Sequence, residues 1–187
     1  MTTPSEHPQS TELDGVRLRP LRRTDAPALY DYLSNPLVTE RTSFPVITMP
    51  MVEGMIVRVQ KRWEEGELSK WGIARAEDDL LVGTCGFNEW SRPHRWAEIA
   101  FDLAQEQWGK GVMHKAVTAL LDWTFGHDQV DRVHAYVRVD NQRSAHLLER
   151  HGFLREGCLR SFRICRGEPH DFSIYSLLRV DWQARQA

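Results

Sequence analysis

Two glycines flank a lysine at the point where a predicted strand ends and a predicted helix begins. Gly109-Lys110-Gly111 follows the strand Ala97–Leu103, and an apolar-periodic stretch starts directly after it. Glycine lets the backbone approach a ligand closely, and a helix start presents unpaired N–H groups with a partial positive charge. The segment therefore predicts an anion site, most naturally for phosphate, with a loop that binds nothing as the alternative. It is not a P-loop, because Gly111 stands where Ser or Thr would bind magnesium.

A second segment of this kind follows about 30 residues later in the chain. Residues 137–153 read as a strand, an asparagine at a helix start (Asn141), and a helix that ends at Gly152-Phe153. Asparagine favours the first position of a helix and glycine its end. The two segments thus place two helix starts beside the ends of two strands.

Together these segments resemble the GNAT superfamily of acyl-CoA-dependent N-acetyltransferases, and most closely its branch of ribosomal-protein N-terminal (alanine/serine) acetyltransferases. The resemblance runs in order from about residue 15 to 182. Four further segments match that branch: Arg19-Pro20-Leu21, Gly83-Thr84-Cys85-Gly86, Glu156-Gly157-Cys158-Leu159-Arg160, and His170-Asp171 before Tyr175-Ser176-Leu177-Leu178.

The resemblance implies that acetyl-CoA is the co-substrate, with its pantetheine arm between the strands at 97–103 and 133–139. The family's pyrophosphate loop reads Arg/Gln-x-x-Gly-x-Gly/Ala, and Trp108 and Met113 depart from its first and last positions. Whether Met113 crowds the phosphate stays open. The cofactor-binding residues expected by resemblance are Phe101, Leu103, Trp108, Gly109, Lys110, Gly111, Val112, Met113, Asn141 and Ser144.

Glu98 is the candidate general base, because it matches the base position of several amine and lysine acetyltransferases of the superfamily. Attack on a thioester requires a neutral amine, so a base must remove a proton, directly or through water. The period of two along a strand places Glu98 on one face with Ala100 and Asp102, opposite Ile99, Phe101 and Leu103. The alternative is an exposed strand carboxylate paired with an arginine.

Ser144 and Asn141 are the candidates for the departing thiolate and for holding the pantetheine. Many family members carry a tyrosine where this chain has Leu148, so the usual general acid is missing. Ser144 lies four residues before Leu148 and therefore on the same helix face. The resemblance implies that Ser144 contacts the thiol and that Asn141 binds the pantetheine or orients a water. The alternative is that both residues only cap the helix.

The amine acceptor is the least predictable part of the site. By resemblance, the loop Arg41–Pro45 contacts the acceptor, and we take Phe44, Trp71, Trp90 and His170 as acceptor-binding candidates. For the two tryptophans the alternative is a core position, and for His170 a structural role. The eight histidines show no zinc spacing, so no metal is expected. Cys85 is expected to be buried and unreactive.

The predicted elements form the order β-α-α-β-β-β-α-β-α-β-β, a mixed α+β plan. The resemblance makes this the GNAT fold: one central, mostly antiparallel sheet of about seven strands, flanked by about four helices and splayed between the strands at 97–103 and 133–139. The helices are expected near residues 26–34, 48–65, 111–125 and 141–151. We expect a disordered lead-in over 1–14, one domain over 15–182, and a tail over 183–187.

Length and composition bound the remaining function classes. The chain has 187 residues, and its 26 acidic residues balance 24 basic ones, 20 of them arginine, so a strongly basic nucleic-acid surface is not expected. No apolar run is long enough for a membrane span. Three cysteines at unrelated spacings argue against a disulfide scaffold and favour a cytoplasmic protein. The expected partner is an amine, either a protein N-terminus or a small molecule; a non-catalytic acyl-CoA-binding module is the alternative, and a homodimer rests on the resemblance alone.

Overall fold

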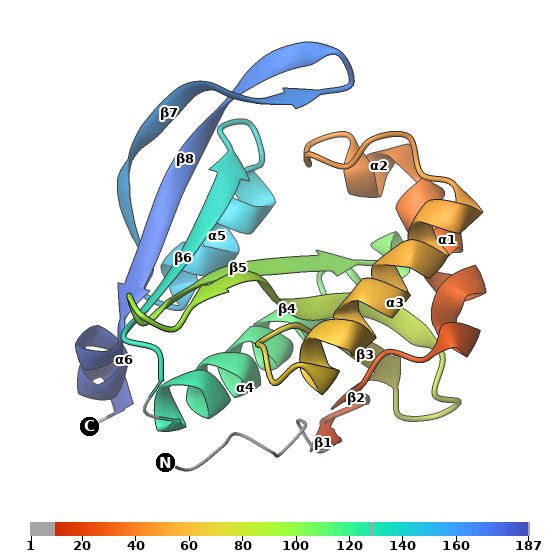
Figure 1. Ribbon diagram of the computed structural model, residues 1–187, viewed down its shortest axis with the longest axis horizontal. Coiled ribbons are helices and arrows are strands. Elements are labelled where there is room, and N and C mark those ends of the chain that lie inside the picture. The colour runs from red at the N-terminus through yellow and green to blue at the C-terminus, as the bar shows by residue number, and fades with distance from the viewer. Residues whose placement is uncertain (1–9, 128, 187) are drawn as a thin grey trace.

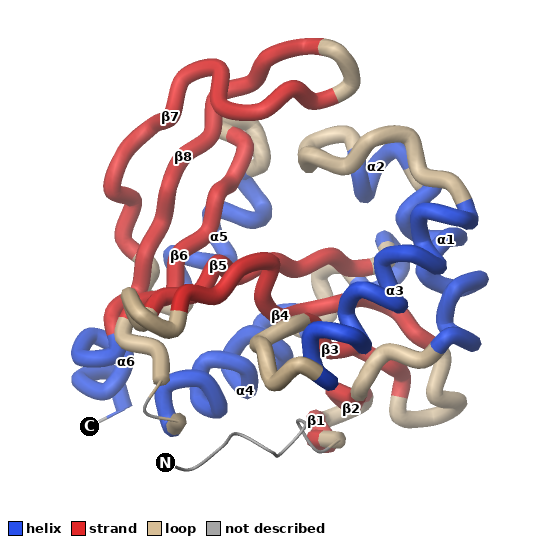
Figure 2. The backbone as a smooth tube through the Cα atoms, viewed as in Figure 1, coloured by secondary structure: helices blue, strands red, loops and turns tan. Residues whose placement is uncertain are grey.

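The computed structural model describes residues 10–127 and 129–186, which form one open sheet and the helices packed on it (Figure 1). Figure 2 shows the same backbone by element type. The eight strands are β1 (Thr11–Leu13), β2 (Val16–Arg19), β3 (Lys70–Arg75), β4 (Leu81–Ser91), β5 (Trp96–Leu103), β6 (Arg132–Arg138), β7 (Leu154–Cys165) and β8 (Glu168–Leu178). The six α-helices in these residues are α1 (Ala26–Ser34), α2 (Pro36–Thr39), α3 (Met49–Glu64), α4 (Val112–Gly126), α5 (Gln142–Arg150) and α6 (Arg179–Gln186).

The sheet has the strand order β1-β2-β3-β4-β5-β6-β8-β7. All neighbouring strands are antiparallel except β5 and β6, which are parallel and joined through α4. That parallel pair has only three rungs, Trp96↔Arg132, Ala97↔Val133 and Glu98↔His134. Beyond the third rung the two strands diverge, and Figure 1 shows β6 rising away from β5. The expected mixed fold and its splay are therefore confirmed.

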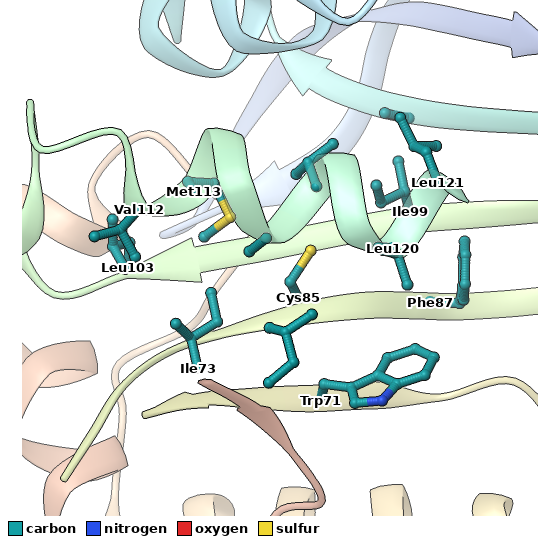
Figure 3. Packing of buried hydrophobic residues seen from close by; sticks show 14 of the residues in the cluster. Trp71, Ile73, Cys85, Phe87, Ile99, Leu103, Val112, Met113, Leu120 and Leu121 are labelled. Carbon is teal, nitrogen blue, oxygen red and sulfur yellow. The ribbon is translucent and has the colours of Figure 1, made fainter. Parts of the chain in front are cut away.

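The main core lies between α4 and one face of the sheet (Figure 3). The helix contributes Val112, Met113, Leu120 and Leu121, each less than a tenth exposed. The sheet contributes the buried side chains Trp71, Ile73, Cys85, Phe87, Ile99 and Leu103. Burial raises the pKa of the Cys85 thiol far above its ordinary value, so this cysteine is inert as expected.

The opposite face of β5 is covered by α1. Tyr32 of that helix donates a hydrogen bond of 2.5 Å to the Asp102 carboxylate, and Thr84 Oγ1 donates another of 2.8 Å. Because Asp102 and Leu103 are consecutive, their side chains leave the strand on opposite faces. The buried carboxylate is therefore satisfied by hydroxyl donors and fixes α1 against the sheet.

Two terminal segments differ from the sequence-based expectation. Residues 1–9 lie outside the described residues, but Thr11–Leu13 form β1 and not a disordered lead-in. The positive φ of Gly15, 78°, allows the tight turn that pairs β1 with β2. At the other end, Arg179–Gln186 form α6 in place of a strand end and tail. This helix is held by Trp182, which is buried and donates to Asp122.

Candidate active site

A cleft opens where β5 and β6 diverge. Four segments line it: residues 41–44 of the loop after α2, residues 98–102 of β5, residues 135–138 of β6, and Asn141 and Ser144 at the start of α5. The β7–β8 hairpin adds Arg163 and Phe172, β3 adds Lys70, and β4 adds Asn88. The paired register of β5 and β6 stops at Glu98 and His134, so the facing backbone edges beyond it border the cleft.

Glu98 lies at the last paired rung, at the closed end of the cleft. The residue is only 5% exposed, so it is not the exposed strand carboxylate of the alternative, although an arginine does lie near it. Asn88 is the extra residue of a bulge in β4, and its amide donates a hydrogen bond of 3.1 Å to Glu98 Oε1. Arg163 Nη2 lies 3.5 Å from the same oxygen. One carboxylate thus meets one neutral donor and one distant cation.

His134 is buried on β6 directly opposite Glu98 in the register. Burial lowers the pKa of this imidazole below its ordinary value, and the nearby Glu98 carboxylate opposes the shift only in part. The ring packs edge-on against Trp96 and Tyr136, at centroid distances of 5.0 and 5.3 Å. A neutral imidazole therefore borders Glu98 at pH 7. No pattern in the sequence singles this residue out.

Asn141 occupies the N-cap position of α5. Its Oδ1 accepts a 3.3 Å hydrogen bond from the backbone N–H of Ser144, and its Nδ2 donates to the carbonyl of Arg41 at 3.3 Å. The capping role is thus present, yet both side chains also border the cleft. Leu148, one turn later, is fully buried. Ser144 and Leu148 lie on one helix face, and only Ser144 brings a hydroxyl to the cleft.

The loop between β5 and α4 has the backbone that its glycines predict. Gly109 and Gly111 both have positive φ, 75° and 74°, which favours glycine. Gly111 is the N-cap of α4 and, having no side chain, leaves the first N–H groups of the helix without a side-chain cap. Lys110 between them is exposed. The chain thus presents a helix start, open to a ligand, at the end of β5.

Trp108 fixes the entrance to this loop. Its Nε1 donates a 2.9 Å hydrogen bond to the carbonyl of Leu103, and the Arg143 guanidinium lies 4.1 Å from its ring centroid. Met113 is buried and its side chain lies in the core (Figure 3), so it does not enter the loop. Val112 and Leu103 are buried beside it, whereas Phe101 is half-buried and borders the cleft.

The four expected acceptor residues separate into two groups. Phe44 borders the cleft. Trp71 does not: it is 3% exposed and packs edge-on against Trp63 and Trp123, so its position is a core position. Trp90 is half-buried with Arg92 over its ring, and His170 pairs with Arg163 in the β7–β8 register. Neither Trp90 nor His170 is among the residues that line the cleft.

The β7–β8 hairpin reaches over the cleft to the loop after α2. Arg166, at the hairpin turn, donates to Thr39 Oγ1 at 3.1 Å, and Arg163 Nη1 lies 3.5 Å from Ser43 Oγ. Arg138 of β6 donates to the Glu40 carbonyl at 2.8 Å. Three arginines thus tie the two walls together. Sequence patterns showed the hairpin but gave no signal that it folds over the site.

In residues 10–127 and 129–186, no group of three or more His, Cys, Asp or Glu side chains could hold a metal ion. Across the same residues, no helix combines the length and apolar character needed to cross a bilayer.

A family model described as "Acetyltransferase (GNAT) domain" matches residues 16–154. The chain is 33% identical over 168 residues to the uncharacterized N-acetyltransferase p20 of Bacillus licheniformis, covering 89% of this chain and 94% of that protein. It is 27% identical to the ribosomal protein uS5-alanine N-acetyltransferase of Escherichia coli, over 69% of this chain and 66% of that one. It is also 33% identical to the spermidine N(1)-acetyltransferase of Vibrio cholerae, over 56% of this chain and 61% of that protein.

Solved structures share the fold over nearly the whole chain. A crystal structure of a probable acetyltransferase superposes with a TM-score of 0.83 at 25% identity, covering 93% of this chain and 99% of the other. A ribosomal L7/L12 α-N-protein acetyltransferase in complex with coenzyme A superposes with a TM-score of 0.82 at 21% identity, again over 93% and 99%.

Proposed function

The chain belongs to the GNAT family of N-acetyltransferases, and from this premise we propose that it transfers the acetyl group of acetyl-CoA to a primary amine bound in the cleft between β5 and β6. The observation that carries the proposal is the place of Glu98. This buried carboxylate lies at the point where the two strands part, and it faces the cleft with an oxygen available to a proton.

The cleft and the start of α4, which does not itself line the cleft, together fit the co-substrate. The start of α4, left without a side-chain cap by Gly111, would hold the pyrophosphate through backbone N–H groups. The diverging edges of β5 and β6 would hold the extended pantetheine arm, with Phe101 along its side. Acetyl-CoA, when bound, supplies an acetyl group activated as a thioester. The near balance of charge in the chain agrees with a phosphate site made mainly of backbone groups.

Glu98 is proposed as the general base. The acceptor binds as the neutral amine after its ammonium proton has passed to solvent, and its nitrogen then forms a bond to the acetyl carbon. The remaining surplus proton on nitrogen passes to Glu98 directly or through a water, while the carbon–sulfur bond breaks. Asn88 holds the carboxylate in place through its 3.1 Å hydrogen bond. A positioned base supplies roughly 10²- to 10⁴-fold in rate.

Ser144 is proposed as the hydroxyl that donates a hydrogen bond to the departing sulfur and passes it a proton taken up from water. It borders the cleft on the first turn of α5, and Leu148 offers no hydroxyl one turn later. Asn141 positions this turn through its hydrogen bond to the Ser144 N–H and ties it to the acceptor loop through Arg41. The products are an N-acetylated amine and free coenzyme A thiol, with no covalent enzyme intermediate.

The acceptor is proposed to be a protein N-terminal α-amine or a small-molecule amine. One relative is named for the alanine of a ribosomal protein and another for spermidine. A non-catalytic acyl-CoA-binding module is the competing function, and the presence of Glu98, Asn141 and Ser144 in the cleft disfavours it.

A thiol-release assay tests the proposal. Purified protein is mixed with acetyl-CoA and a panel of peptides and small amines, and free thiol is measured against time, with acetyl-CoA binding followed separately by calorimetry. We expect amine-dependent thiol release with a matching N-acetylated product. Tight acetyl-CoA binding without transfer to any amine would instead assign the chain to the binding modules.

A further inference from the structure

The arginine at position 163 lies next to the proposed base although the two residues are 65 positions apart. Arg163 comes from β7 and Glu98 from β5, and the distance from Nη2 to Oε1 is 3.5 Å. Arg163 also borders the cleft itself. A cation and a carboxylate therefore face the same small volume.

Three aromatic rings hold the Arg163 guanidinium at this place. Its central carbon lies 5.3 Å from the ring centroid of Tyr136, 5.1 Å from that of Phe162 and 5.5 Å from that of Phe172. These rings come from β6, β7 and β8, so the whole C-terminal half-sheet positions one side chain. Contacts of this kind fix a guanidinium without occupying its N–H donors.

A bulge in β7 gives Arg163 its position. Between the rungs Leu159↔Phe172 and Arg163↔His170, β7 carries more residues than β8. Ser161 in this bulge has a φ of 48°, and its backbone N–H donates to the Asp171 carboxylate at 2.8 Å. A bulge re-aims the side chains that follow it.

The polar contacts of Arg163 leave donors to spare. Its two polar partners, Glu98 Oε1 and Ser43 Oγ, both lie 3.5 Å away, at the outer limit of a hydrogen bond. A guanidinium has five N–H donors, and this side chain is 31% exposed. A ligand oxygen in the cleft can therefore bind it at normal distance.

We propose that Arg163 binds a carbonyl or carboxylate oxygen on the carbon next to the one that carries the acceptor amine, while Glu98 receives the amine. In such an α-amino carbonyl compound the nitrogen and the oxygen lie roughly 3 Å apart across two carbons, which matches two neighbouring protein groups. The acceptor class is thus an amino acid or a peptide N-terminus. This inference rests on the proposed acetyl transfer and narrows its acceptor.

The charges around the cleft disfavour a polyamine. Besides Arg163, its lining carries Arg41, Lys70 and Arg138, against the carboxylates of Glu98 and Asp102. Arg138 pairs with Asp140 and Arg41 with Glu40, so the second ammonium of a polyamine would meet mainly Lys70 and Arg163. Like charges at close range are costly and reject the wrong partner.

Matched pairs of acceptors test the inference. Each pair joins an amino acid amide with the amine that lacks its carbonyl: alaninamide with ethylamine, and phenylalaninamide with 2-phenylethylamine. Free alanine offers a carboxylate oxygen and a short Ala-peptide offers a peptide carbonyl oxygen, so the two acceptors distinguish these sources. Spermidine completes the panel. We expect kcat/KM for the carbonyl-bearing member to exceed that of its partner by about tenfold or more, because a buried hydrogen-bonding site rejects analogues that leave it unpaired.

Variants assign the effect to one side chain. Arg163→Met should bring the amide-to-amine ratio close to one, and Arg163→Lys should restore part of it. Arg155→Met is the matched control, because Arg155 is an exposed arginine of the same strand that does not line the cleft; it should keep the wild-type ratio. Binding of acetyl-CoA, measured by calorimetry, should be equal in all variants.

The outcomes are distinguishable. Equal kcat/KM within each pair, or spermidine as the best acceptor, would overturn the inference and leave the proposed transfer standing. If Arg163→Met still prefers the carbonyl-bearing acceptors, another residue binds the carbonyl oxygen, and the role of Arg163 is overturned. Acetyl-CoA binding with no transfer to any member would overturn both this inference and the proposed function.

Discussion

Glu98 has a close neighbour that provides a control for its role. Glu89 stands opposite it in the β4–β5 register but is exposed, and it does not line the cleft. Glu98→Gln keeps the shape of the side chain and removes its basicity, so kcat/KM should fall by roughly 10²- to 10⁴-fold while acetyl-CoA still binds. Thiol release over a range of pH measures this. Glu89→Gln should match the wild type, and near wild-type turnover of Glu98→Gln would remove Glu98 as the base.

Ser144 should matter for the chemical step more than for binding. Ser144→Ala should lower kcat by roughly 10²-fold, because the departing thiolate loses its donor. The dissociation constant for acetyl-CoA should change far less. Ser34→Ala, at an exposed helix end away from the cleft, is the control. An unchanged kcat would reduce Ser144 to the helix cap that its backbone already forms with Asn141.

Single residues show where sequence reasoning ends. Glu98, Asn141 and Ser144 could be selected because the segments that carry them resemble the GNAT superfamily, while local patterns placed them on a strand and at a helix start. Trp71 could not be assigned, since an aromatic strand residue suits a pocket and a core equally, and only its packing against two other tryptophans decides. Arg163 gave no local signal, because its relation to Glu98 depends on a bulge and a long-range contact.

At the scale of the element, Gly86 in β4 and Gly54 in α3 differ in the space available for a side chain. A Cβ at Gly86 of β4 would lie 2.4 Å from the Ser69 carbonyl oxygen and 2.5 Å from Lys70 Cα, both backbone atoms. A Cβ at Gly54 in α3 would meet nothing within 4 Å. The close approach of β3 and β4 therefore requires glycine at one site, and nothing requires it at the other.

Alanine substitutions at these two positions should therefore change the free energy of unfolding in opposite directions. Gly86→Ala should lower the free energy of unfolding by roughly 2–4 kcal/mol, since backbone must shift. Gly54→Ala should raise it by roughly 0.5–1 kcal/mol, because alanine favours the helix interior. Urea unfolding monitored by circular dichroism measures both. Equal stability of the two variants would contradict the tight packing of β3 on β4.

Elements with a strong internal period were predicted well. The apolar stripe of α3 includes Val52 and Ile56, which are buried, and the helix spans nearly the predicted range. The short β1 and the terminal α6 were missed because their own sequences carry little pattern. Pairing with β2 stabilises β1, and burial of Trp182 stabilises α6; both are tertiary effects that no local period contains.

For the whole molecule, the buried histidines predict how stability depends on pH. Burial lowers the pKa of His134 and of His151 below the value of about 6.5 that they have when unfolded. The unfolded chain therefore binds more protons than the folded one once the pH drops below about 6.5, and stability is lost from there down to the folded pKa values. Carboxylates such as Glu156, whose pKa is lowered from 4.5 to about 2, add a further loss below about pH 4.5.

Unfolding in urea at pH 7.5 and 5.5 measures the first of these losses. The free energy of unfolding should be lower at pH 5.5, and His151→Gln should reduce that difference. His94→Gln removes an exposed histidine and should leave the difference unchanged. A wild type with equal stability at both pH values would contradict the burial of the two imidazoles.

The three-rung contact between β5 and β6 has a consequence for how the chain assembles. Strands β1 to β5 follow one another in sequence and in space, and β6, β7 and β8 form a second group of near neighbours in sequence. The strand pairs beside the seam have more rungs, eight for β4 with β5 and seven for β6 with β8, whereas the parallel seam has three, and parallel pairing is slightly less stable per residue. We expect the seam to be the last part to gain protection from hydrogen exchange during refolding. The cleft, which begins where that seam ends, is then completed only once both halves have folded.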